Sequence, residues 1–127
     1  MIRRHVLVYA FATAFALSSP ALAQAPNSAL NALVTKHARA NNVPEALVHR
    51  IIFEESRYHP RAVGRGGAMG LMQIKYSTAR GLGYRGSPAG LLDPDTNLTW
   101  AVRYLAGAWR MSQGDPDVAR ILYGTGY

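Results

Sequence analysis

The stretch that decides the fold class is NVPEALVHRIIFEES, residues 42–56. An asparagine, an early proline and a glutamate three residues after the asparagine are typical of a helix start, so Asn42 is the expected N-cap. The residue before a proline is disfavoured in a helix, so Pro60 should bound the segment. Apolar side chains recur at helical spacing, namely Leu47, Val48, Ile51 and Ile52. The pattern predicts an amphipathic helix that buries one face.

Two adjacent acids lie near the end of this stretch, and helical geometry separates them. Glu55 falls almost at the centre of the apolar stripe, whereas Glu54 lies about a quarter turn away and four residues after Arg50. Glu54 is expected in an ordinary exposed ion pair with Arg50. A carboxyl directed into apolar surroundings has a raised pKa, which suits a general acid near neutral pH. Glu55 is therefore the candidate catalytic acid, and the alternative is a structural acid in water or paired with Arg57 or Arg61.

The rest of the chain alternates predicted helices with glycine-rich loops, and no segment has a convincing strand pattern. Helices are expected from Ser28, with Asn27 or Ser28 as cap, to Asn41–Asn42; at about Ser77–Gly81; from Asp93–Pro94 or Thr96 to about Met111; and from Asp115–Pro116 onward. Loops are expected at 63–70 and 81–94. The buried positions should be Leu98, Ala101, Val102, Leu105 and Trp109, and in the last helix Val118, Ile121 and Leu122. The predicted class is mainly α.

The first residues have the layout of a secretory signal peptide. Arg3, Arg4 and His5 precede an apolar run from Val6 to Leu17, and the small-residue triplet Ala21–Ala23 follows. The run of 12 residues is shorter than the about 20 that cross a hydrocarbon core, so an uncleaved anchor is the weaker interpretation. We expect a signal peptide at 1–23 and one exported domain at 24–127, without an integral membrane span.

The chain is basic and contains no cysteine. It has 14 Lys plus Arg against 7 Asp plus Glu, and removal of Arg3 and Arg4 leaves 12 against 7, a charge of +5. Such a charge favours polyanionic partners, and the export signal argues against nucleic acid. Without cysteine there is no disulfide, thiolate zinc site, thiol nucleophile or cysteine-linked lipid anchor. The segment Gly64–Met69 matches neither a dinucleotide fingerprint nor a phosphate loop. We expect no metal and no cofactor.

Several ordered motifs resemble those of the soluble lytic transglycosylases. They are Glu55-Ser56, Pro60–Val63, Gly67–Gln73, Asn97-Leu98 and Ala101–Leu105, and the resemblance spans about Val43 to Tyr123. It implies a lysozyme-like single helical domain with a glycan-binding groove, and it implies that Glu55 is the catalytic acid and base. The substrate-binding residues that it implies are Ser56, Gly70, Leu71, Met72, Gln73, Asn97, Tyr104 and Tyr123.

The implied roles of these residues differ. Ser56 would orient the acid or the sugar, Met72 and Gln73 would line the groove, and a packing role is the alternative for Tyr104. The chain also departs from the family pattern in two places. Gly124-Thr125-Gly126 replaces the usual Asn-Ala-Gly after Tyr123, and Lys75-Tyr76 stands where many relatives have a proline shortly after the glutamine.

The resemblance implies cleavage of the β-1,4 bond between N-acetylmuramic acid and N-acetylglucosamine in peptidoglycan, with a 1,6-anhydro end. Ordinary glycosidases use two carboxylates, but capping explains most of the other acids of this chain. A reaction that uses a single carboxylate is therefore favoured. The alternatives are a lysozyme-like hydrolase and a non-catalytic glycan-binding module of a secretion apparatus. A cationic membrane-active protein would need a basic amphipathic face that the sequence lacks. We expect a periplasmic or wall-associated protein whose partners are glycan strands and secretion or conjugation machinery.

Overall fold

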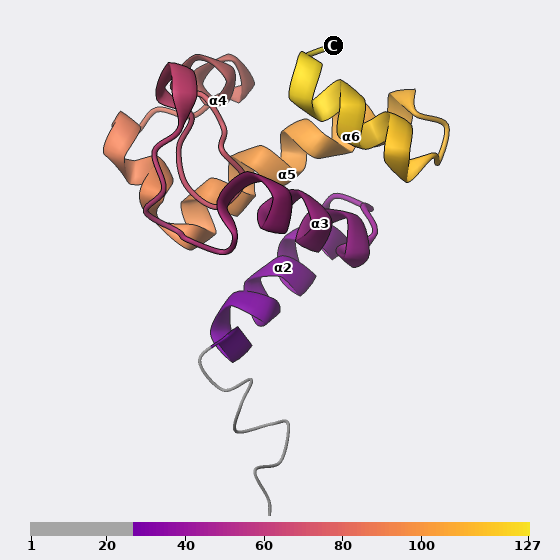
Figure 1. Cartoon of the computed structure of the whole chain (residues 1–127), viewed down its shortest axis with the longest axis horizontal. Coiled ribbons are helices and arrows are strands. Elements are labelled where there is room, and N and C mark those ends of the chain that lie inside the picture. The colour runs from indigo at the N-terminus through magenta and orange to yellow at the C-terminus, as the bar shows by residue number, and fades with distance from the viewer. Residues whose placement is uncertain (1–26) are drawn as a thin grey trace, which may run out of the picture.

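The computed structural model describes residues 27–127, which fold into helices joined by short loops (Figure 1). The elements in chain order are α2 (Ser28–Ala40), α3 (Glu45–Ser56), the 3-10 helix η2 (Arg65–Gly67), α4 (Tyr76–Leu82), the 3-10 helix η3 (Pro88–Leu92), α5 (Pro94–Met111) and α6 (Pro116–Thr125). Pairing of β type within 27–127 is limited to two isolated bridges. The predicted mainly α class is confirmed, and the predicted signal peptide at 1–23 lies outside the described residues.

Helix α5 is the central element and packs against α2, α4, α6 and η3. Its predicted apolar stripe is confirmed, because Leu98, Ala101, Val102 and Leu105 are fully buried and Trp109 is partly buried against the core. In Figure 1 this long helix runs between the α4 side and the α6 side of the molecule. None of the helices in 27–127 is long and apolar enough to cross a membrane.

Two aspartate caps set the starts of α5 and α6. The Asp93 side chain accepts a hydrogen bond from the Thr96 amide at 2.9 Å, and Asp115 accepts from Asp117 and Val118 at 2.9 and 3.2 Å. A proline follows each cap, where its missing N–H costs nothing because the first helical amides have no partner within the helix. Both predicted starts are confirmed.

The helix α3 begins within the expected segment 42–45, but the predicted cap is wrong. Asn42 has a φ of 53° and lies outside the helix, which begins after Pro44 without a side-chain cap. Glu45 accepts a hydrogen bond from the Thr35 hydroxyl at 3.1 Å, which ties α3 to α2. The helix ends at Ser56, before Pro60, because Arg57 and Tyr58 have φ values of 51° and 63°. The predicted stripe of Leu47, Val48, Ile51 and Ile52 is confirmed as buried.

The predicted inner face of α6 is confirmed for Leu122 and wrong for Val118 and Ile121. Val118 and Ile121 are 40% and 55% exposed, whereas Ala119 and Tyr123 are buried and Leu122 is partly buried. Ala119 and Tyr123 are four residues apart and therefore share a face. The large aromatic ring of Tyr123 is the group that α6 directs to the core, and this choice turns the β-branched residues outward.

The segment between α3 and α4 is a compact glycine-rich turn. Met69 and Ile74 exchange two backbone hydrogen bonds at 2.9 and 3.1 Å, and Gly64 donates to the Ala68 carbonyl at 2.8 Å. The 3-10 turns η2 and η3 lie inside the predicted loops, and α4 extends one residue beyond each end of its predicted span. This turn brings residues 68–75 to the end of α3.

Candidate active site

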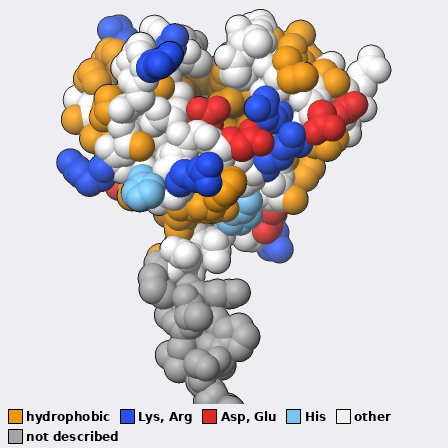
Figure 2. All heavy atoms as spheres, viewed as in Figure 1, with side chains coloured by type: hydrophobic (Ala, Val, Ile, Leu, Met, Phe, Trp, Pro, Cys, Tyr) orange, Lys and Arg blue, Asp and Glu red, His pale blue; other side chains and the backbone are white. Residues whose placement is uncertain are grey.

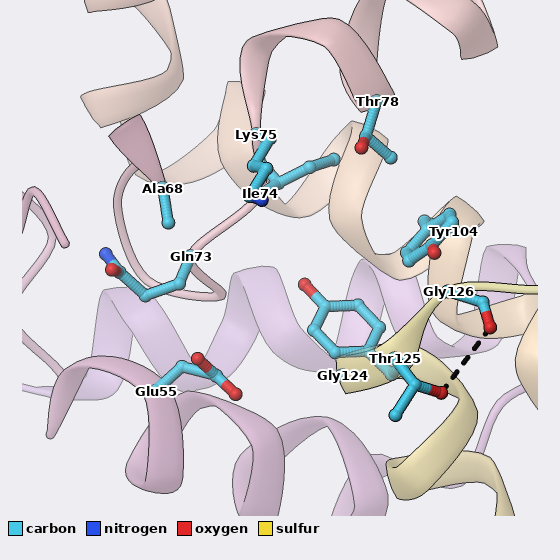
Figure 3. Close-up of a pocket in the computed structure, with 11 residues that line it drawn as sticks. Glu55, Ala68, Gln73, Ile74, Lys75, Thr78, Tyr104, Gly124, Thr125 and Gly126 are labelled. Carbon is cyan, nitrogen blue, oxygen red and sulfur yellow. Dashed lines mark hydrogen bonds between the residues drawn. The ribbon is translucent and has the colours of Figure 1, made fainter. Parts of the chain in front are cut away.

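An open cavity of about 320 Å³ lies where the end of α3, the glycine-rich turn, α4, α5 and α6 come together (Figure 3). Figure 2 shows the surface hollowed between the α4 and α6 sides, with acidic side chains near the hollow. The lining residues are Glu55, Ala68, Gln73, Ile74, Lys75, Thr78, Tyr104, Tyr123, Gly124, Thr125 and Gly126. The residues that line the cavity therefore come from segments far apart in the sequence.

Glu55 projects into this cavity from the last turn of α3 (Figure 3). The expectation that it lies among buried apolar neighbours needs correction, because its side chain is exposed. The helix ends one residue later, so Glu55 extends past the buried stripe into the open cavity. Partial desolvation in the cavity nevertheless raises the pKa of Glu55, and the negative charge of Glu54 raises it further, against a smaller opposing effect of Arg120. A carboxyl with this shift can hold a proton at higher pH than an ordinary glutamate.

Glu54 has a different environment from its neighbour. Its carboxylate accepts hydrogen bonds from Arg50 at 3.3 Å and from Arg120 of α6 at 2.5 Å. The predicted pair with Arg50 is thereby confirmed, and the Arg120 contact also ties α3 to α6. Among the ion pairs of residues 27–127, none includes Glu55. Glu54 thus belongs to an ion-pair network, whereas Glu55 lines the cavity.

Gln73 shapes the wall opposite the helix end. Its backbone has a φ of 50°, and its side-chain amide donates to the carbonyls of Ala62 and Gly70 at 3.1 and 3.0 Å. A Cβ on Gly64 would lie 2.1 Å from the Gln73 side-chain oxygen, so any other residue at position 64 would force this side chain to shift. Gln73 lines the cavity, and its amide donates two hydrogen bonds within the turn.

Four other predicted site residues lie behind the cavity wall rather than on it. Gly70, Leu71, Met72 and Asn97 are buried and are absent from the lining, so the expectation that Met72 lines the groove is corrected. The Asn97 amide donates to the carbonyls of Met69 and Leu91 at 2.9 and 2.8 Å and accepts from the Met72 amide at 3.1 Å. All three polar contacts are internal, so Asn97 fastens the Gly70–Met72 segment to α5.

Aromatic rings form the wall on the side of α5 and α6. Tyr104 and Tyr123 pack edge to face with centroids 5.4 Å apart, and Tyr127 stacks on Tyr104 at 4.9 Å. The Tyr123 hydroxyl donates to the Met72 carbonyl at 2.6 Å, and its burial raises the pKa of Tyr123 well above the ordinary value. Tyr104 and Tyr123 thus both line the cavity. The Tyr127 hydroxyl donates to the Tyr104 carbonyl, a contact that sequence analysis missed.

Ser56 is buried, and its hydroxyl donates to the Ile52 carbonyl at 3.1 Å. Ser56 is therefore next to Glu55 in sequence but does not line the cavity. It can affect Glu55 only by stabilising the last turn of α3. Sequence analysis missed Ala68, Ile74 and Thr78 of the lining. Their closeness to Gln73 in the sequence could have indicated them, since all three lie within five residues of it. No cluster of three potential metal ligands among His, Asp and Glu occurs in the described part of the chain.

Comparisons with known proteins agree with this architecture. The family model described as the transglycosylase SLT domain matches residues 32–126. The peptidoglycan transglycosylase gp16 of Escherichia phage T7 is 34% identical over 97 residues, which are 74% of this chain and 7% of that protein.

Two solved structures have the same fold. The 70-kDa soluble lytic transglycosylase of Escherichia coli matches with a TM-score of 0.70 and 27% identity, over 76% of this chain and 16% of that one. The same enzyme type in complex with bulgecin A matches with a TM-score of 0.72 and 27% identity, over 80% and 17% of the two chains. The chain thus spans a small part of the length of each of these relatives.

Proposed function

Because the chain belongs to the transglycosylase SLT domain family, we propose that it is a peptidoglycan lytic transglycosylase. The bond cleaved is the β-1,4 link between N-acetylmuramic acid and N-acetylglucosamine, and the product carries a 1,6-anhydromuramic acid end. The observation that carries this proposal is the position of Glu55, a carboxyl of raised pKa that projects into an open cavity bounded by aromatic and amide side chains.

The proposed reaction uses this carboxyl twice. Protonated Glu55 gives its proton to the glycosidic oxygen, the bond from this oxygen to C1 breaks, and the electron pair leaves with the N-acetylglucosamine oxygen. The resulting carboxylate then removes the proton from the C6 hydroxyl of the same muramic acid. The C6 oxygen bonds to C1 and closes the anhydro ring, while the N-acetyl group of that sugar stabilises positive charge at C1. Protons balance without water, because the nucleophile is part of the substrate and is held near C1 by the sugar ring.

A single acid in the lining favours this route over hydrolysis. Ordinary glycosidases place a second carboxylate across the scissile bond, either as nucleophile or to activate water. Among the residues that the structure describes, Glu55 is the only acid that lines the cavity. Glu54 faces Arg50 and Arg120, and the carboxylates of Asp93 and Asp115 cap helices. No described acid is therefore free to serve as the second carboxylate within the cavity.

The other site residues divide into two proposed groups. Gln73, Tyr104 and Tyr123 bound the space in which a sugar would bind, because they line the cavity with Glu55. Gly70, Leu71, Met72 and Asn97 support this wall from behind, and Ser56 steadies the turn of α3 that carries the acid. We place the enzyme in the periplasm or at the cell wall after removal of residues 1–23, with glycan strands as its substrate. Secretion or conjugation machinery is the second proposed partner.

Product analysis tests the proposal. Purified peptidoglycan is digested with the full chain, and the fragments are identified by mass spectrometry. The proposal predicts 1,6-anhydro ends, which Glu55→Gln abolishes while its thermal unfolding stays unchanged. Glu45→Gln is the matched control on the same helix, since Glu45 contacts Thr35 away from the cavity. Reducing ends would identify a hydrolase, and glycan binding without any cleavage by the wild type would identify a non-catalytic module.

A further inference from the structure

One positively charged side chain, Lys75, lines the cavity. The chain has only two lysines, Lys36 and Lys75. Lys75 is exposed and directly precedes α4, on the opposite side of the cavity from Glu55 (Figure 3). Its side chain reaches over the glycine-rich turn, because a Cβ built on Gly66 would lie 3.4 Å from both Cε and Nζ of Lys75. Lys75 thus lines the cavity, and the end of its side chain lies beside the glycine-rich turn.

Within the described residues, no acidic side chain forms an ion pair with Lys75. The other lysine, Lys36, lies 3.7 Å from Asp95. Apart from Glu55 on the opposite side of the cavity (Figure 3), the other acidic side chains have partners of their own. Glu45 contacts Thr35 and Arg39, Glu54 contacts Arg50 and Arg120, and Asp117 contacts Arg50. Asp93 and Asp115 cap helices.

Lys75 and the catalytic acid line the same cavity from opposite sides (Figure 3). An unpaired cation in this position is placed to act on the ligand. A lysine ammonium attracts carboxylates as a compact point charge with three donors.

The proposed substrate carries a matching anion. Every second sugar is muramic acid, whose lactyl ether ends in a carboxyl. That carboxyl is free on peptide-free strands, and on substituted strands it is joined to a peptide that has carboxylates of its own. We infer that Lys75 binds a carboxylate carried on the muramic acid of the strand, and that it makes the cavity selective for acidic over neutral N-acetylated glycans. This inference rests on the proposed function.

The test separates charge recognition from catalysis. Binding is measured by calorimetry in a Glu55→Gln background, so that no glycan is consumed, with Lys75→Gln, Lys75→Arg and Lys36→Gln compared. The probes are peptide-bearing peptidoglycan fragments, peptide-free strands made by amidase treatment, and neutral N-acetylglucosamine oligomers of equal length. Lys36→Gln is the matched control, because it removes the other lysine from α2 away from the cavity lining.

We expect Lys75→Gln to weaken binding of carboxylate-bearing strands about fivefold, the size of one partly solvated charge pair. Lys75→Arg and Lys36→Gln should bind as the parent does, and the neutral oligomers should not distinguish the variants. Added salt should reduce the difference. Loss with peptide-bearing fragments alone would assign the stem-peptide carboxylate, and loss with peptide-free strands alone would assign the lactyl carboxylate. Loss with both would also support the inference.

Two outcomes would overturn the inference. One is unchanged binding of every carboxylate-bearing probe by Lys75→Gln, and the other is an equal loss with the neutral oligomers. In the otherwise wild-type enzyme, Lys75→Gln should raise KM on acidic strands and leave kcat nearly unchanged. Failure of the proposed function is recognised separately, as the absence of anhydro products from the wild type, because the binding comparison does not depend on cleavage.

Discussion

The hydroxyl of Tyr123 donates a 2.6 Å hydrogen bond to the backbone carbonyl of Met72. This bond joins α6 to the turn that carries Gln73, across 51 positions of the sequence. Burial raises the pKa of Tyr123, so the phenol stays protonated and remains a donor. The contact therefore fixes one wall of the cavity against another.

We predict that Tyr123→Phe destabilises the fold by about 1–2 kcal/mol, because the buried Met72 carbonyl loses its partner while the ring packing is kept. Thermal or urea unfolding measures this loss. Tyr104→Phe is the stability control, since in the described residues no hydrogen bond to the Tyr104 hydroxyl is formed and the ring is retained. Equal destabilisation by the two variants would contradict the importance of the Tyr123–Met72 bond.

Local chemistry in the sequence was sufficient to predict most of the helices. Asp93 and Asp115, each followed by proline, start α5 and α6 where predicted, because a cap and its amides lie within three residues of each other. Asn42 was predicted as a cap on the same grounds and is not one, since its φ of 53° places it outside the helix. Val118 and Ile121 were wrongly assigned to the inner face of α6, because the Met72 carbonyl that Tyr123 contacts is distant in sequence and cannot be found from periodicity.

The candidate site shows the same division between local and distant causes. Helix geometry singled out Glu55 from its neighbour Glu54, and Glu55 is the acid that lines the cavity. Its exposure was not predicted, because it depends on which segments cover the end of α3. The role of Asn97 was also hidden, since its contacts with Met69 and Met72 join residues 28 and 25 positions apart. Side-chain type and spacing do not encode such contacts.

The pH dependence of cleavage should respond to the charges beside Glu55. A general acid must be protonated, so kcat/KM should fall as the pH rises through the pKa of Glu55. The negative charge of Glu54 raises that pKa and Arg120 lowers it. We therefore predict that Glu54→Gln moves the alkaline limb of the profile to lower pH and Arg120→Gln moves it to higher pH. Profiles of anhydro-product formation measure both, and a shift of both variants in the same direction would refute the assignment of Glu55.

Acid stability should depend on the contact between α2 and α5. Nε2 of the buried His37 lies 2.6 Å from Oδ1 of Asp95, and this hydrogen bond, with the charge of Lys36, lowers the pKa of Asp95. A carboxyl whose pKa is lowered by folding adds stability above its unfolded pKa of about 3.9, and this contribution is lost as the pH falls through the folded value.

Asp95→Asn should therefore be less stable than the wild type near neutral pH, and the difference should disappear in acid. The effect should stay below about 1 kcal/mol, because the Asp95 side chain is 50% exposed. Urea unfolding over a pH series measures it. Lys36→Gln removes only the weaker partner and should give a smaller difference; a pH-independent gap between Asp95→Asn and wild type would contradict this account.

The wall behind the cavity should tolerate no side chain at Gly70. Gly70 and Gly67 have nearly equal positive φ values, 72° and 75°, but a Cβ on Gly70 would lie 2.4 Å from the Asn97 amide nitrogen and 2.5 Å from the Leu91 carbonyl oxygen. A Cβ on Gly67 would meet nothing within 4 Å. The two sites share the backbone cost of the left-handed conformation and differ in the clash.

Gly67→Ala should cost about 1 kcal/mol, the penalty for a left-handed alanine. Gly70→Ala should cost about 3 kcal/mol or more, because backbone strain adds to overpacking and the Asn97–Leu91 hydrogen bond must break. Chemical unfolding measures the loss of stability in both variants. The difference between the two losses gives the cost of the clash, because the backbone cost is nearly the same at both positions. Hydrogen exchange at the Met72 amide should accelerate in Gly70→Ala alone, because this amide donates to Asn97. Equal losses of stability would mean that Asn97 and Leu91 can move aside, and the wall would then be softer than its contacts indicate.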